Sequence, residues 1–266
     1  MKIAFIGGGN MGEAIIAALL DKKLAAAGDI SVAEVVKERR DYLAKKYGVA
    51  VMESGTAAVK GREVIVLAVK PQSLPDVLVA LKGALAPAQL VLSIAAGVRI
   101  AAISRGLGHE HVVRSMPNTP AQIGWGISGW TATPAVTEKE KGLARAILGA
   151  MGHEIYFDDE KYLDMVTAVS GSGPAYCFLF AEALVEAAVN IGLARPEAER
   201  LVLQTMLGSA HLLEKSGRPA AELRRNVTSK GGTTERALQV FEKGNFTQLV
   251  SEAVKAAFQR ATELGG

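Results

Sequence analysis

A glycine-rich turn near the start of the chain has the residues needed to hold a phosphate group. It reads Ile6, Gly7, Gly8, Gly9, Asn10, Met11 and Gly12, which fits the spacing G-x-G-x-x-G. A strand pattern precedes the turn and an apolar helical pattern follows it, so helix amides and the positive end of a helix dipole would face a ligand. Gly7 permits a tight turn, Gly9 lets the backbone approach a pyrophosphate, and Gly12 allows close helix packing. The pattern predicts a dinucleotide site.

The residues after the second predicted strand bear on which dinucleotide is bound. Glu34 ends that strand, where a carboxylate can accept both ribose hydroxyls of NADH. Lys37, Arg39 and Arg40 follow closely, and such a basic cluster could instead hold the 2′-phosphate of NADPH. A solvated helix start would explain the same three cations without any ligand. The sequence leaves NADH and NADPH both open.

Three further segments close predicted strands and belong at the same edge of a sheet, where such folds bind ligands. They are Ala68-Val69-Lys70-Pro71, then Ser93 to Gly97 with Ala95, and then Met116 to Pro120 with Asn118. We expect Lys70 to face the cofactor, and the small residues of the second segment to admit a flat nicotinamide ring. Two prolines would stiffen the third loop. The alternative for Lys70 is an ordinary surface lysine. For the second segment it is close packing without function, and for the third it is a plain turn.

Two segments in the second part of the chain are suited to a carboxylate. Ser170, Ser172 and Gly173 offer hydroxyls and close backbone access just before a long helical pattern. Gly232, Thr233 and Thr234 precede another helical pattern, so free amides and threonine hydroxyls would gather at its positive end. A helix cap alone would account for only one of these threonines.

The elements that must position these residues divide the chain in two. Strand patterns cover 3–6, 30–33, 64–69, 90–95, 112–114 and 155–157, with helical patterns between several of them. Apolar strands alternating with helices are typical of a mainly parallel sheet covered on both faces. After Asp158 only helical patterns remain, over 161–169, 174–192, 196–215, 219–226, 233–242 and 246–264. We predict an α/β, Rossmann-like doubly wound domain over 1–158 and an all-α domain over 159–266.

Composition narrows the class of protein. Hydrophobic residues make up 49% and charged residues 21%, which excludes a disordered chain. Basic residues are scattered, so we expect no nucleic-acid partner. The single cysteine, Cys177, and a start unlike a signal peptide favour the cytoplasm. The apolar stretch 175–194 carries Glu182 and Glu186, which favours a buried interface helix over a membrane span.

These segments together resemble the pyrroline-5-carboxylate reductase family. The resemblance rests on the glycine-rich turn, Val-Lys-Pro-Gln at 69–72, Ser-Ile-Ala-Ala-Gly-Val at 93–98, Met-Pro-Asn-Thr-Pro at 116–120, Ser-Gly-Ser-Gly-Pro-Ala-Tyr at 170–176 and Gly-Gly-Thr-Thr at 231–234, and it spans nearly all 266 residues. It implies a Rossmann domain with a helical dimerisation domain, and dimers that can assemble into rings up to decamers. It also implies reduction of Δ1-pyrroline-5-carboxylate to L-proline by NADPH or NADH, the last step of proline biosynthesis.

For that reaction the residues have separate expected roles. The Thr234 hydroxyl would be hydrogen-bond partner or proton relay to the iminium nitrogen, which makes it the catalytic candidate. The amides of Gly232 and Thr233, with Ser170 and Ser172, would hold the substrate carboxylate, beside Met116 and Gly173. The resemblance suggests that the loop of 231–234 comes from the partner subunit. Two departures stand out: Lys230 replaces the usual proline and loosens that turn, and Glu34 differs from the small polar or basic residue of many NADP-dependent relatives.

Other chemistries fit the sequence less well. A β-hydroxy acid dehydrogenase of the related two-domain type would carry G-x-x-G-x-x-x-K, but no lysine follows Gly173 at that spacing. We expect no metal site, because His109 and His111 flank Glu110 without a third clustered ligand. A nucleotide-sensing or scaffold protein without turnover stays an alternative, since fold does not fix function.

Overall fold

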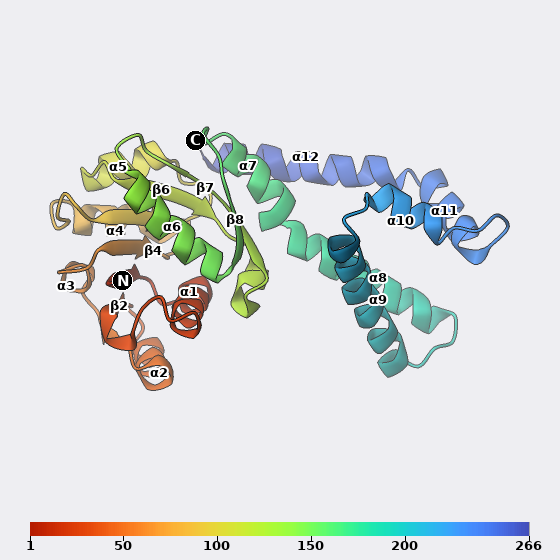
Figure 1. The fold of residues 1–266 in the computed structure, drawn as a ribbon, viewed down its shortest axis with the longest axis horizontal. Helices are drawn as coiled ribbons and strands as arrows, with labels where there is room; N and C mark the ends of the chain where they lie inside the picture. Colours follow the sequence, from red (N-terminus) through yellow and green to blue (C-terminus); the bar gives the residue numbers. More distant parts are fainter. Residues whose placement is uncertain (266) are drawn as a thin grey trace. The chain divides into compact units, whose positions relative to one another are not determined.

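The computed structural model describes residues 1–265 and divides them into two compact units. One unit holds Met1–Ser172 together with the residues from Ala257 onward, and the other holds Gly173–Ala256. The last strand ends at Tyr156, near the predicted domain limit at residue 158, whereas residues 159–172 group with the sheet. Figure 1 shows the sheet with its helices, and separately the helices of the second unit.

The first unit is built on one eight-stranded sheet with the order β3-β2-β1-β4-β5-β6-β7-β8 among the described residues. The strands are β1 (Ile3–Ile6), β2 (Ile30–Ala33), β3 (Ala50–Met52), β4 (Val64–Leu67), β5 (Leu90–Ser93), β6 (Val112–Met116), β7 (Gly126–Ala132) and β8 (Gly152–Tyr156). All neighbouring pairs are parallel except β6 with β7. The predicted mainly parallel sheet is confirmed, and β3 and β7 are additions to the predicted strands.

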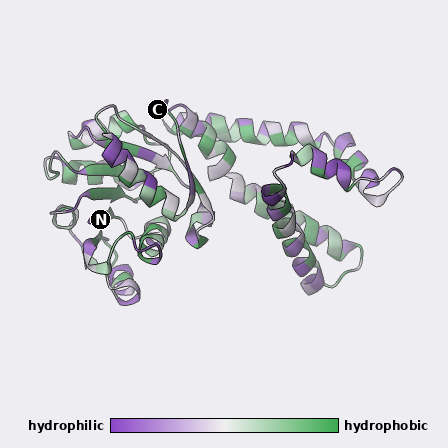
Figure 2. Ribbon diagram, in the orientation of Figure 1, coloured by the Kyte–Doolittle hydropathy of each residue, from purple (hydrophilic) through white to green (hydrophobic). Residues whose placement is uncertain are grey.

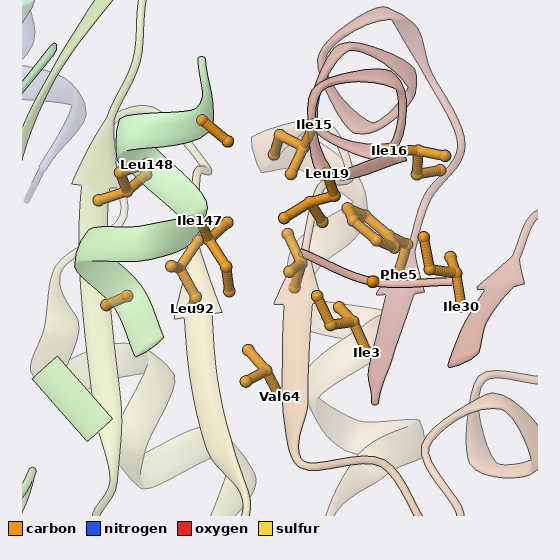
Figure 3. Packing of buried hydrophobic residues seen from close by; sticks show 14 of the residues in the cluster. Ile3, Phe5, Ile15, Ile16, Leu19, Ile30, Val64, Leu92, Ile147 and Leu148 are labelled. Carbon is orange, nitrogen blue, oxygen red and sulfur yellow. The ribbon is translucent and has the colours of Figure 1, made fainter. Parts of the chain in front are cut away.

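Helices cover both faces of this sheet, which is why the adjacent strands β1 and β4 are apolar throughout. They are α1 (Asn10–Asp21), α2 (Lys37–Tyr47), α3 (Gly55–Ala58), α4 (Leu74–Leu81), α5 (Ile100–Leu107), α6 (Glu138–Ala150) and α7 (Tyr162–Val166). In Figure 3, Ile15 and Leu19 of α1 lie close to Phe5, while Ile147 of α6 lies over Leu92. A second cluster joins α4 and α5 to the other face, through residues such as Leu78, Ile103 and Ile65.

The second unit is helical, as predicted. Its helices are α8 (Gly173–Asn190), α9 (Arg195–Ser216), α10 (Ala220–Asn226) and α11 (Thr233–Lys243), with most of α12 (Phe246–Leu264). Within the described range 173–256 only Ala198 and Val202 are buried. Apolar side chains are instead exposed: Phe178 is 68% and Leu179 67% accessible, and Figure 2 shows hydrophobic residues along α8. One copy of this unit therefore does not cover its own apolar surface.

Candidate active site

The cofactor half of the candidate site lies where the strand order reverses. β1 pairs with β2 on one side and with β4 on the other, so the connections that leave these strands diverge at their carboxyl ends. Doubly wound sheets bind nucleotides in the crevice at this switch point. The glycine-rich turn leaves β1 here, and α1 begins at Asn10 directly after it. The predicted strand, turn and helix are confirmed.

Different structural constraints explain why each of these positions is a glycine. Gly7 has φ +100°, and a Cβ there would lie 2.7 Å from the Ala68 carbonyl oxygen. A Cβ on Gly12 would lie 2.7 Å from the Gly7 carbonyl oxygen, so α1 needs glycine to approach the turn. Gly9 differs, because no described atom outside its chain neighbours lies within 4 Å of where its Cβ would be. That open space in front of a helix N-terminus is what a pyrophosphate requires.

A cleft of about 590 Å³ joins four strand ends at the same edge. Its lining residues come from the loops after β1, β4, β5 and β6, and they are Gly9, Asn10, Met11, Ala68, Val69, Lys70, Pro71, Ile94, Ala95, Ala96, Met116 and Pro117. Nine of these were predicted from sequence as cofactor or substrate residues, from segments more than 100 residues apart. The prediction that these loops share one edge is therefore met by the structure.

A second pocket, of about 310 Å³, lies beside the glycine-rich turn and shares Val69 with the cleft. Ile6, Gly7 and Glu34 line it, together with apolar residues of α4 such as Val77. An apolar hollow at the end of β2 is suited to an adenine ring with its ribose against the strand end. Sequence reasoning missed eight of the twelve lining residues, among them the acidic Glu53 after β3 and Asp76 in α4.

The Glu34 carboxylate is held in a fixed place at this pocket. The Gly8 amide donates to its Oε2 at 2.9 Å, and the Val36 amide donates to its Oε1 at 3.0 Å. Each carboxylate oxygen can accept more than one hydrogen bond. Glu34 can therefore stay bonded to the turn and still accept from a ligand hydroxyl.

Three of the predicted cofactor residues do not line either pocket: Gly8, whose amide donates to Glu34, and the two loop residues Gly97 and Asn118. Gly97 has φ +72°, and a Cβ there would lie 2.9 Å from the Leu264 Cβ, so the end of α12 packs directly on this loop. The Asn118 side chain accepts a hydrogen bond from the Ile127 amide at 3.0 Å, which fixes the start of β7. In this structure both residues shape the loops that carry Ala95 and Met116.

A buried ionic cluster fixes the elements that carry these loops. Arg114 of β6 is 3% exposed and lies 2.6 Å from Glu160, whose Oε1 also accepts from the Ile100 amide at 2.7 Å. Asp164 of α7 lies 2.8 Å from Arg99 and 3.6 Å from Arg114. The cluster thus ties the loop after β5, the end of β6 and helix α7 together.

The predicted serine segment forms an irregular turn beside the cleft. Residues Thr167–Gly171 are π-helical, and the Ser172 amide donates to the Thr167 carbonyl at 2.8 Å. The Ser170 hydroxyl donates to the Val166 carbonyl at 3.1 Å. A Cβ on Gly171 would lie 2.8 Å from Met116 Cε, so this turn lies against a residue that lines the cleft. Such π-turns are frequent at functional sites.

The threonine loop, residues 231–234, lies in the second unit. α11 begins at Thr233 with Gly232 as its N-cap, so the predicted helix start is confirmed. The Gly232 amide donates to the Ser229 carbonyl at 3.0 Å, and the Gly231 amide to Glu235 Oε2 at 2.8 Å. First-turn amides have no partner inside their own helix. Those of Thr233 and Thr234 therefore offer the donors at this helix end.

One carboxylate links the glycine-rich turn to α2. Glu13 accepts from Tyr47 at 2.7 Å and from Lys46 at 3.0 Å, and it pairs with Arg39, which also donates to the Gly8 carbonyl at 2.6 Å. Burial alone would raise the pKa of Glu13, but the hydrogen bonds from Tyr47, Lys46 and Arg39 outweigh it and lower the pKa from 4.5 to about 2. The carboxylate stays ionised and fixes the turn.

Comparison with known proteins places this geometry in a family. The family model described as pyrroline-5-carboxylate reductase dimerisation matches residues 160–264, and one described as NADP oxidoreductase coenzyme F420-dependent matches residues 2–97. A curated pyrroline-5-carboxylate reductase of Pseudomonas aeruginosa is 45% identical over 264 residues, covering 99% of this chain and 96% of that protein. The chain belongs to the pyrroline-5-carboxylate reductase family.

Solved structures agree with that membership. A pyrroline-5-carboxylate reductase from Coxiella burnetii has a TM-score of 0.93 at 39% identity, covering 100% of this chain and 98% of that one. A Plasmodium falciparum pyrroline carboxylate reductase with NADP bound has a TM-score of 0.90 at 32% identity, with coverage of 100% and 98%. The predicted fold class, a parallel α/β sheet followed by a helical dimerisation domain, is confirmed.

The dimerisation match explains the apolar surface of the second unit. By length and composition alone, Tyr162–Asn190 is apolar enough to cross a membrane, and 6% of its most apolar window is buried within one copy. The same residues fall inside the matched dimerisation region. The protein is a homo-oligomer, and contacts between copies commonly bury apolar surface of this kind. Among residues 1–265, no group of three His, Cys, Asp or Glu is placed to hold a metal ion.

Proposed function

We propose that this chain reduces the C=N bond of Δ1-pyrroline-5-carboxylate to give L-proline, the last step of proline biosynthesis, with NADPH or NADH as hydride donor. The observation that carries the proposal is the cleft in which the ends of β1, β4, β5 and β6 meet. Full-length relatives of 45% and 39% identity bear the name pyrroline-5-carboxylate reductase, which supports the same activity here. We place the homo-oligomer in the cytoplasm, as a dimer able to form rings up to a decamer.

The residues of the first unit fit a dinucleotide. The open space at Gly9 and the N-terminus of α1 would receive the pyrophosphate, and the pocket at Glu34 would receive the adenosine. The nicotinamide end would then lie in the cleft, near Ala95 and Met116. When bound, the reduced nicotinamide supplies the hydride, and the protein has to position the imine and exclude water.

The proposed substrate residues have two separate roles, to bind the substrate carboxylate and to contact the imine nitrogen. The first-turn amides at the start of α11, with Ser170 and Ser172, would hold the substrate carboxylate. The Thr234 hydroxyl would hydrogen-bond the imine nitrogen, either as a simple partner or as a relay that regains from solvent the proton it gives. No protein nucleophile is needed, because a protonated imine is already electrophilic. We propose that the loop of 231–234 serves the cleft of the partner subunit in the dimer.

Loss of absorbance at 340 nm with Δ1-pyrroline-5-carboxylate, measured with NADH and NADPH in parallel, tests the function. The wild type should oxidise at least one cofactor rapidly. Thr234→Val keeps the shape of the side chain and removes the hydroxyl, so kcat should fall about 10- to 100-fold. Thr234→Ser keeps the hydroxyl and should retain most of the activity.

Thr247→Ala is the matched control, since Thr247 is an exposed threonine of α12 that lines neither pocket. Its kcat should equal that of the wild type. If neither cofactor is oxidised by the wild type, the reductase proposal fails. If Thr234→Val is as active as the wild type, the reductase proposal stands but the role of Thr234 does not.

A further inference from the structure

The last turns of α12 belong to the compact unit of the sheet. The helix begins in the second unit, but its residues from Ala257 onward group with the first unit. Ala261, one turn before the end of the helix, is buried at 5% exposed. The end of α12 is therefore packed within the unit that carries the cofactor cleft.

Two residues at this end contact the loop that follows β5. A Cβ on Gly97 would lie 2.9 Å from the Leu264 Cβ and 3.3 Å from the Leu264 carbonyl oxygen, so the loop backbone lies directly against Leu264. A Cβ on Gly265 would lie 2.8 Å from Arg99 Nε, so the helix end also lies against that guanidinium. The absence of a side chain at Gly97 and Gly265 is what allows so close an approach.

Arg99 is held from another side by α7. Its Nη2 lies 2.8 Å from Asp164 Oδ2, and the Asp164 side chain is 5% exposed. Movement of Arg99 away from this carboxylate would leave a buried charge without its partner, which is costly. The end of α12 and helix α7 therefore fix the far end of the loop together.

The stretch between β5 and these anchors has few other restraints. The Ala95 amide donates to the Ser93 hydroxyl at 3.3 Å. Beyond it, no hydrogen bond joins residues 96–98 to another segment in the described part of the chain. Ala95 and Ala96 line the cleft. Packing of the loop against Leu264 therefore decides where this wall of the cleft lies.

We propose that Leu264 is a positioning residue for the cofactor, which fixes Gly97 and so keeps the wall at Ala95 and Ala96 in the form that admits the nicotinamide ring. Leu264 lines neither pocket, so it acts through the loop and not on the ligand. Without this contact the loop would have to be ordered at each binding event, and the lost conformational entropy weakens binding. The inference rests on the proposed function for which end of the cofactor lies here, but it concerns cofactor binding and needs no substrate.

Calorimetric binding of NADPH to the full-length protein, without substrate, is the direct test. Leu264→Gly removes the Cβ that packs on Gly97, and we expect the dissociation constant for NADPH to rise about fivefold. NADH should show the same rise, because both cofactors share the nicotinamide end. With saturating cofactor and substrate, Leu264→Gly should keep the kcat of the wild type while its KM for NADPH rises.

Two controls isolate the contact from general loosening of the helix end. Leu264→Ala keeps the Cβ, and because the Leu264 side chain is 57% exposed, this variant should bind NADPH within about twofold of the wild type. Glu263→Gly loosens the same turn at an exposed residue that lines neither pocket, and its NADPH affinity should equal that of the wild type.

A double-mutant cycle with Gly97→Ala tests whether the two residues act together. In the wild type the new Cβ meets the Leu264 Cβ at 2.9 Å, so Gly97→Ala should weaken NADPH binding about tenfold. In the Leu264→Gly background that atom is absent, and the same change should weaken binding about threefold or less.

Equal NADPH affinities of Leu264→Gly and Leu264→Ala would overturn the proposal, as would the same cost of Gly97→Ala in both backgrounds. Failure of the reductase function gives a different result. A wild type that binds NADPH but does not turn over Δ1-pyrroline-5-carboxylate would contradict the reductase proposal and leave the role of Leu264 in cofactor binding intact.

Discussion

Arg114 and Glu160 form a buried ion pair, 2.6 Å apart, in which the arginine is 3% exposed. The pair joins β6, whose last residue is Met116, to the segment that precedes α7. Arg114→Met would leave the Glu160 and Asp164 carboxylates short of a buried partner. We expect it to lower the free energy of unfolding by about 3 to 5 kcal/mol, measured by urea denaturation.

An exposed pair of similar geometry provides the control for that prediction. Arg260 and Glu263 also lie 2.7 Å apart, but both side chains are more than 60% exposed. Arg260→Met should change the free energy of unfolding by less than about 1 kcal/mol. Equal effects of the two substitutions would show that burial of the Arg114 cluster does not matter.

Gly97→Ala should weaken cofactor binding as well as stability. The residue has φ +72°, and the new Cβ would meet Leu264 Cβ at 2.9 Å, so the loop that carries Ala95 must shift. We expect a loss of about 2 to 4 kcal/mol from backbone strain and crowding together, and a raised KM for the cofactor.

Gly61→Ala separates the two causes. Gly61 has a similar φ of +68°, but no described atom outside its chain neighbours lies within 4 Å of where its Cβ would be. It should lose only the strain term, about 1 to 2 kcal/mol, with an unchanged KM. A Gly97→Ala protein with the stability and KM of Gly61→Ala would disprove the role of the Leu264 contact.

Glu13 should stabilise the fold in a pH-dependent way. Its pKa is lowered from 4.5 to about 2, so its contribution is fully present above pH 4.5 and is lost as pH falls through about 2. Glu13→Gln should therefore cost about 1 to 2 kcal/mol near pH 7, with solvent screening part of the interaction, and much less near pH 2. Urea denaturation of both proteins at the two pH values gives the difference. A gap that does not shrink on acidification would contradict the ionised carboxylate.

The exposed apolar face of α8 should control assembly. Leu179→Glu places a charge on this exposed apolar surface, and a symmetric contact between copies would contain the charge twice. We expect the association constant to fall at least about tenfold, with a lower melting temperature, by analytical ultracentrifugation and calorimetry. Val79→Glu is the control, since Val79 is 76% exposed on α4 of the first unit. An oligomer that survives Leu179→Glu unchanged would place the contact elsewhere.

Local chemistry made part of the site predictable from sequence. The glycine-rich turn and the start of α11 depend on residues within a few positions of one another, so their spacing alone indicates the strand, turn and helix. The cleft was predictable for a related reason, because strands of a parallel sheet bring their following loops to one edge whatever the loop sequences are.

The parts that sequence did not predict depend on distant partners. β3 has only three residues and lies at the edge of the sheet, so its apolar run is too short to predict a strand. Glu53, which follows it, was missed as a pocket residue. β7 contains two glycines and is defined by pairing with β6 and β8. The contacts of Arg39 with Gly8 and Glu13 were likewise not predictable, since these partners are 26 or more residues away in sequence.

The sparse burial within Gly173–Ala256 has a consequence for how the protein is made. A newly synthesised chain can complete its sheet alone, because that core is contained in one copy. The apolar side chains of the helical half stay exposed in a lone copy. Assembly of the homo-oligomer requires an encounter with another chain, so it is a second-order process that slows as expression falls. Chaperones and proteases therefore compete with self-recognition for each new molecule, and a variant that pairs slowly would be lost by degradation before its chemistry could be assayed in the cell.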